Sequence, residues 1–138
     1  MPNIIEIAEA LKTVCATYAD AAEVKLYPEK WLGDTESGLF CIVKPNDLTN
    51  VIEARSGGSL TYEFEVGFLK WIADESEGQT LLLQVETFIK EIVGTLLLNN
   101  QYVVNAVTPN ILYSVTAYDR RKQFASILTV GVYDNEYA

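Results

Sequence analysis

The chain has 138 residues, 49% hydrophobic and 21% charged, which fits one folded domain spanning residues 1–138 and argues against a disordered chain. Nineteen acidic residues against ten basic ones give a formal net charge of −9, which disfavours specific binding to nucleic acid through its phosphates. The sequence contains no histidine, so a histidine base, a Ser–His–Asp triad and a histidine-ligated metal are excluded.

The N-terminal segment predicts an amphipathic helix over residues 3–20. Its apolar residues recur at intervals of three and four, and Asn3 and Glu6 have the spacing of a capping box. A short strand is expected over residues 23–27, ended by Pro28. A loop over residues 29–38 follows, and its apolar anchor is Trp31-Leu32.

The next part of the chain predicts three strands. The first covers residues 39–44, and Pro45-Asn46-Asp47 is expected to turn it into a second strand over residues 48–55. A Gly-containing loop then leads into the stretch SGGSLTYEFEVGFLKWI, residues 56–72, which alternates with the two-residue period of a strand. One face carries the apolar residues Leu60, Tyr62, Phe64, Val66 and Phe68, and the other carries Thr61, Glu63 and Glu65.

A second helix is predicted to begin within residues 74–78, with Ser76 and Gln79 at capping-box spacing, and to continue through Leu98 to a stop at Asn99-Asn100. The last third predicts strands over residues 102–107, 111–118 and 124–133, with turns over 108–110 and 119–123. The resulting fold class is α+β: two helices packed on a mainly antiparallel β-sheet in a two-layer sandwich, with the apolar face of residues 60–68 against the long helix.

The two cysteines, Cys15 and Cys41, lie among apolar residues and lack the spacing of a metal or redox motif. Free cysteine is among the residue types most often buried, so both are predicted to be core thiols. The first residues of the chain lack a secretory signal, and no apolar run approaches the ~20 residues of a membrane span. We therefore expect a cytoplasmic protein that does not contact a membrane.

Glu63 and Glu65 are the first candidate site. On a strand they point the same way and lie ~7 Å apart, a separation that would suit a pair of glycosidase carboxylates. Alternating Glu residues on a solvated or interfacial strand face give the same spacing without chemistry, and this reading is favoured. The acid-rich segments 34–36 and 74–77 lack the spacing of a calcium loop. We therefore expect no catalytic residue, no cofactor and no metal.

Apolar residues on both faces of the predicted sheet raise the possibility of a subunit interface. Leu69 and Trp71 oppose the core-facing positions, so the second face is covered either by another subunit or by loops 29–38 and 99–111. Arg120-Arg121-Lys122 is either a solvated turn or a contact for an acidic patch on a neighbour. The candidate interface residues are Glu63, Glu65, Trp71, Arg120, Arg121 and Lys122.

Several local patterns together resemble a known family. They are a short strand ending in Tyr27-Pro28, the strand YEFEVGF at residues 62–68, one long helix, and a final strand containing FASILTVGVY at residues 124–133. In this order they resemble the tail-terminator or tail-completion proteins of long-tailed bacteriophages, a family that includes small neck and minor tail proteins.

The resemblance implies a structural virion assembly protein without enzymatic activity. Such a protein forms a homo-oligomeric ring, usually a hexamer, that caps the tail tube and supports head–tail joining. Its partners are tail-tube and head-connector proteins, and DNA passes through the ring without specific binding. It acts in the host cytoplasm during assembly and then in the virion tail. The alternatives are a head-completion or minor tail adaptor of the same fold, or a small acid/base enzyme that uses Asp and Glu.

Overall fold

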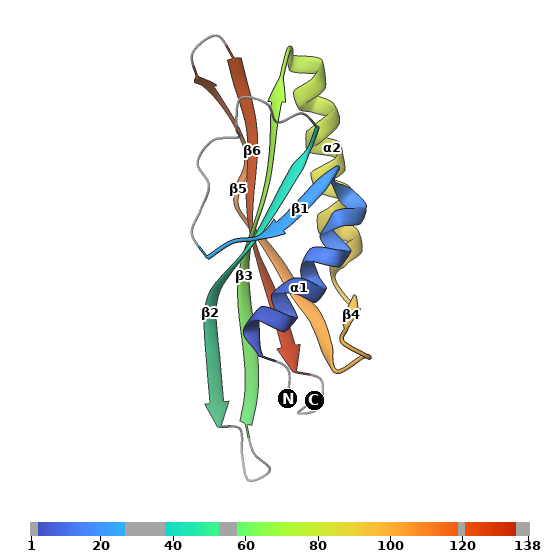
Figure 1. Cartoon of the computed structure of the whole chain (residues 1–138), viewed down its shortest axis with the longest axis vertical. Coiled ribbons are helices and arrows are strands. Elements are labelled where there is room, and N and C mark those ends of the chain that lie inside the picture. Colours follow the sequence, from blue (N-terminus) through green and yellow to red (C-terminus); the bar gives the residue numbers. More distant parts are fainter. Residues whose placement is uncertain (1–2, 27–37, 53–57, 119–120, 135–138) are drawn as a thin grey trace.

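The computed structural model describes residues 3–26, 38–52, 58–118 and 121–134. Within these ranges, two α-helices and a short 3-10 helix accompany a single six-stranded sheet (Figure 1). The helical elements are α1 (Ile4–Cys15), η1 (Ala16–Tyr18) and α2 (Glu75–Ile92). The strands are β1 (Ala21–Val24), β2 (Phe40–Ile52), β3 (Gly58–Ile72), β4 (Leu96–Leu97), β5 (Tyr102–Tyr118) and β6 (Arg121–Asp134).

The strand order is β1-β2-β3-β6-β5-β4, and every neighbouring pair is antiparallel except β1 and β2, which are parallel. The expectation of a two-layer α+β sandwich is wrong. Strand accounts for 55% and helix for 31%, and the sheet curls into a half-barrel, with both helices on one side of it (Figure 1). Because the right-handed twist of a strand accumulates with its length, four strands of 13 to 17 residues curl the sheet strongly.

Two of the strands are longer than predicted because each contains a proline that was expected to end it. Pro45 and Pro109 were expected in turns, yet each lies inside a continuous strand, opposite Phe64 and Leu128 respectively. β1 reaches β2 only as far as Val43, and β4 reaches β5 only at its start. Both prolines therefore lie where the described residues place no strand on the outer side, and proline is tolerated more readily there than in a central strand. Register irregularities at both places bend the strands further.

The first helix follows its prediction at the N-terminus. The side chain of Asn3 accepts a hydrogen bond of 2.9 Å from the N–H of Glu6, which confirms Asn3 as the N-cap. The α-helix ends at Cys15 and continues only as η1, short of the predicted residue 20. The buried face of α1 contains Ile7, Ala8, Leu11 and Cys15.

The second helix differs from its prediction at both ends. Its N-cap is Asp74 rather than Ser76: Asp74 Oδ1 accepts from the N–H of Glu77 at 3.0 Å. The helix ends at Ile92, because Gly94 follows with a φ of +92° and supplies the left-handed residue that terminates helices. Leu96 and Leu97, predicted as helix, instead pair with Tyr102 and Val103 of β5, and Leu97 still reaches the core.

The different N-cap gives a direct test. We expect Asp74→Ala to lower the free energy of unfolding by about 1 kcal/mol, because it removes an acceptor for one of the unpaired N–H groups of the first turn. Ser76→Ala is the matched control, and it should change the free energy of unfolding by less than about 0.5 kcal/mol. Urea unfolding followed by circular dichroism measures both. Equal losses in the two variants would contradict the assignment of Asp74.

The core lies between the helices and one face of the sheet. Tyr62, Phe64, Val66 and Phe68 of β3 are buried there, which confirms the predicted inner face, and Leu60 is partly buried against it. Phe88 of α2 packs edge-to-face on Phe68, with ring centroids 5.0 Å apart. Cys15 and Cys41 are both fully buried and not in a disulfide, which confirms the prediction of two core thiols.

Candidate assembly surface

The outer side of β5 is an open sheet edge. β4 pairs with Tyr102 and Val103, and further backbone hydrogen bonds join Val104 to Gly94 and Thr95. Beyond this point, residues 106–117 pair with β6 alone among the described residues. We call residues 106–117 the β5 edge segment. The outward N–H and C=O groups of such an edge are ready to pair with another extended chain.

The β5 edge segment is also apolar and exposed. Ile111, Leu112, Tyr113 and Val115 each expose between 44% and 54% of their surface. Natural proteins usually protect a long edge strand with lysine, proline or a bulge. This segment has Pro109 and register irregularities but no charged side chain. These four large apolar side chains within five residues form an exposed apolar patch along the edge, divided between the two faces of the strand: Ile111 pairs with Ile127, whereas Val115 pairs with the core residue Phe124. Exposed apolar residues of this kind are typical of an interaction surface.

A cavity of about 520 Å³ lies next to this patch, between the first turns of α2 and the ends of β5 and β6. Its apolar lining includes Ile72, Leu82, Tyr113, Val115 and Phe124. The ring of Tyr113 stacks on Phe124, with centroids 6.4 Å apart and planes 6° from parallel. Asp74, Glu75 and Lys122 contribute the charged part of the lining. The cavity therefore extends the apolar surface of the β5 edge segment toward the helix.

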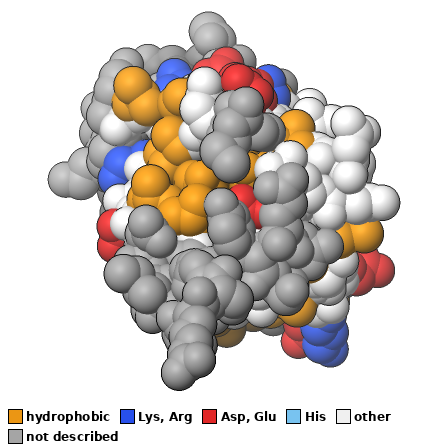
Figure 2. All heavy atoms as spheres, turned by 90° about the horizontal axis from the view of Figure 1, so that it is seen from below, with side chains coloured by type: hydrophobic (Ala, Val, Ile, Leu, Met, Phe, Trp, Pro, Cys, Tyr) orange, Lys and Arg blue, Asp and Glu red, His pale blue; other side chains and the backbone are white. Residues whose placement is uncertain are grey.

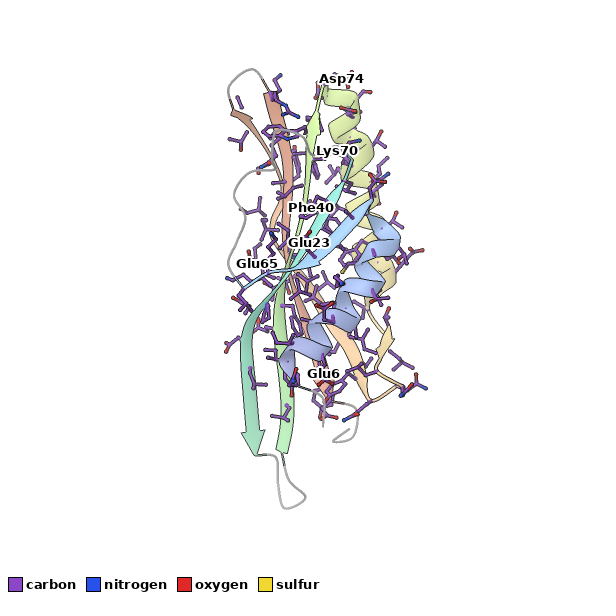
Figure 3. The ribbon with its side chains drawn as sticks, in the orientation of Figure 1. Glu6, Glu23, Phe40, Glu65, Lys70 and Asp74 are labelled. Carbon is purple, nitrogen blue, oxygen red and sulfur yellow. The ribbon has the colours of Figure 1, made fainter. Side chains whose placement is uncertain are left out.

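Glu63 and Glu65 lie on the face of β3 opposite the core, and Figure 3 shows Glu65 on the side away from the helices. Their neighbours across the strands differ. Glu65 lies between Lys44 and Thr129, whereas Glu63 lies between Asp47 and Gly131. Both carboxylates are partly exposed, and neither lines the cavity next to β5. Within the ranges that the structure describes, no three His, Cys, Asp or Glu residues are grouped to hold a metal ion.

The structure separates the predicted basic cluster. The guanidinium carbon of Arg121 lies 4.1 Å from the ring centroid of Trp71, in a cation–π contact on the same face as Glu63 and Glu65. Lys122 points to the opposite face and lines the cavity. Arg120 lies outside the described residues. Trp71 lies six positions after Glu65 on β3, about 20 Å along the strand, so the acidic pair and Arg121 lie far apart on one sheet face.

A small apolar cluster occupies this second sheet face. Ile42 and Leu69 are buried, and Phe40, Trp71 and Ala125 pack around them. Of the two loops considered as a cover, the loop over residues 99–111 was wrongly predicted, since residues 102–111 belong to β5. The loop predicted over residues 29–38 lies outside the described residues except for Gly38.

A further apolar surface lies at one end of the molecule. Figure 2 looks at the molecule from below the view of Figure 1, and hydrophobic side chains gather on this end in one group. Acidic and basic side chains appear mainly around this group rather than within it. The apolar surface of the molecule is thus not limited to the β5 edge segment.

The β5 edge segment was not among the predicted site residues, although the sequence contains a signal for it. Residues 92–118 contain no Asp, Glu, Lys or Arg, in a chain of which 21% is charged. Such a run indicates either a fully buried segment or an exposed one that meets a partner. Residues 108–110 resemble a turn, however, and this resemblance divides the run into two short predicted strands and hides the length of β5.

None of the helices in the described part of the chain has the length and apolar character needed to cross a membrane. No protein-family model matches the sequence, and no curated protein matches it significantly.

Proposed function

We propose that this protein is a structural virion assembly protein, a tail-terminator-like ring subunit that caps the phage tail tube and supports head–tail joining. The observation that supports the proposal most is the β5 edge segment. An exposed, uncharged strand edge is a hazard for a protein that works alone, because other chains can pair with it. In a subunit of a larger assembly the same edge is an interface, and its apolar side chains become buried.

The charge of the chain supports the second part of the proposal. A ring of subunits that each carry a formal charge of −9 would repel DNA, so the genome could slide through without being held. The apolar group at the end of the molecule is a suitable surface for stacking on a tail-tube or head-connector protein (Figure 2). In this role the protein needs no catalytic residue, no metal and no cofactor.

Ring formation can be tested on the purified chain. We expect multi-angle light scattering to give a mass of several subunits at high protein concentration, and negative-stain electron microscopy to show closed rings. Closed cyclic symmetry is the expectation because a terminator must not polymerise without limit. A monomeric mass over the whole accessible concentration range, with no rings in the micrographs, would contradict the proposal. Open filaments would contradict it as well.

A further inference from the structure

The sheet has a second open edge besides the β5 edge segment. β1 pairs with β2 at residues 40–43 only, so residues 44–52 of β2 pair with β3 alone among the described residues. We call residues 44–52 the β2 edge segment. In Figure 1 the lower part of β2 and the upper part of β5 both lie on the side away from the helices. Neither helix therefore blocks the approach of another strand.

The two segments are compatible in length and in charge. At ~3.3 Å per residue they extend over roughly 30 Å for β2 and 40 Å for β5. The β5 edge segment has no charged residue, and the β2 edge segment has one of each sign, Lys44 and Asp47. Two copies with a charge of −9 repel each other, so a contact between copies is most favourable where the facing segments carry no net charge.

Apolar matching favours the same pairing. Leu48, half exposed on the β2 edge segment, supplies an apolar side chain to face the exposed residues of the β5 edge segment. Pairing between two β5 edge segments would also bury apolar surface, but it would close as a dimer and leave every β2 edge segment open. Pairing between unlike edges uses both of them in every copy, and a heterologous contact of this kind can close a ring.

We propose that the β5 edge segment of one copy adds as a strand to the β2 edge segment of the next copy. The sheet then continues from subunit to subunit, held by backbone hydrogen bonds between the two edges and by burial of Ile111, Leu112 and their neighbours against the adjoining copy. This inference rests on the proposed function in that it names the contact through which the copies associate.

Amide hydrogen exchange tests the contact without knowledge of the register. We expect exchange in residues 44–52 and in residues 106–117 to slow by at least tenfold between dilute and concentrated protein, because strand addition protects the N–H groups of both edges. Exchange in residues 75–92 of α2 should not change. Slowing in residues 106–117 alone would overturn the proposal, since it would indicate pairing of β5 with itself or with another surface.

A matched pair of variants provides the second test. Ile111→Lys puts a charge on the β5 edge segment, and Leu83→Lys puts the same charge on an exposed apolar position of α2. We expect Ile111→Lys to raise the concentration at which copies associate by at least about tenfold, because the buried charge opposes the contact. Leu83→Lys should leave it unchanged, and circular dichroism checks that both variants fold. Equal association of Ile111→Lys and the unchanged protein would overturn the proposal.

The two levels of the proposal fail differently. If light scattering and micrographs show rings but neither edge segment slows its exchange, the copies associate through another surface; the strand-addition contact is then wrong and the ring function stands. If both segments slow but the particles are open filaments, the contact stands and the terminator function is wrong. A monomer at every concentration, with unchanged exchange, would overturn both.

Discussion

Replacing Phe88 by alanine should lower the free energy of unfolding by about 3–5 kcal/mol, the largest effect that we expect from one substitution. Phe88 is fully buried in the C-terminal half of α2. Its ring packs edge-to-face on Phe68 of β3 at 5.0 Å and on Tyr18 of η1 at 5.1 Å. The alanine variant loses the transfer energy of the ring, leaves a cavity, and removes two aromatic contacts of about 0.5–1.5 kcal/mol each.

This loss is large compared with the 5–15 kcal/mol that typically stabilises a domain, so the variant should unfold at a much lower urea concentration. Phe88→Leu keeps most of the buried volume and should lose less than half as much. Leu83→Ala on the exposed side of the same helix should lose less than about 0.5 kcal/mol. If Phe88→Ala were as stable as Leu83→Ala, Phe88 could not be the contact between α2, β3 and η1.

Alternation along one strand was the most informative signal in the sequence. Residues 60–68 keep a strict two-residue period because one face of β3 packs on the core and the other does not. The same alternation, continued to Trp71 and applied to the partner strand, would have separated Arg121 from Lys122. Adjacent strand residues point to opposite faces, so Arg121 and Lys122 cannot belong to one patch.

The positions of Pro45 and Pro109 show what the pattern of a single strand cannot determine. Pro45 and Pro109 look like turns because proline interrupts a central strand. Their tolerance depends on how far β1 and β4 extend along the neighbouring strands, which is a property of the whole sheet. The curl of the sheet has the same origin. It follows from the length of the strands, and a prediction that ends β2 at Pro45 and divides β5 at Pro109 makes these strands too short to curl the sheet.

The predicted boundaries of α2 were wrong for a local reason. The apolar stripe of α2 continues past Gly94 to Leu97, and Leu97 is indeed buried. The stripe therefore indicated burial correctly but assigned the wrong backbone, because both a helix and a short edge strand can deliver that leucine to the core. Gly94 was the available stop signal, and Asp74 was the available N-cap two residues before Ser76.

The two cysteines join α1 to β2 in the core, and their contact has a consequence for stability at high pH. A hydrogen bond with Cys15 and burial in the core raise the pKa of the Cys41 thiol well above its ordinary value of 9.0. Both causes favour the neutral thiol, because a buried thiolate would lose its hydration without gaining a cationic partner. In the unfolded chain the same thiol regains its ordinary pKa.

The sign of the pH dependence follows from these two pKa values. Below pH 9.0 both states keep the Cys41 proton, so the contribution to stability is fully present. As the pH rises above that value, the unfolded chain releases the proton while the folded chain retains it. The folded state then binds more protons, and the free energy of unfolding falls by up to about 1.4 kcal/mol per pH unit.

We therefore expect urea unfolding between about pH 8 and pH 10.5 to show a steeper loss of stability in the unchanged protein than in Cys41→Ala. The alanine variant starts from a lower stability because it loses buried volume, so the slopes are compared rather than the absolute values. The pKa of Tyr18 is raised as well, by burial and by the hydrogen bond of its hydroxyl to Glu91, but this effect is common to both proteins and cancels. Parallel pH profiles would show that Cys41 ionises in the folded state as readily as in the unfolded chain, which a thiol enclosed between α1 and β2 cannot do.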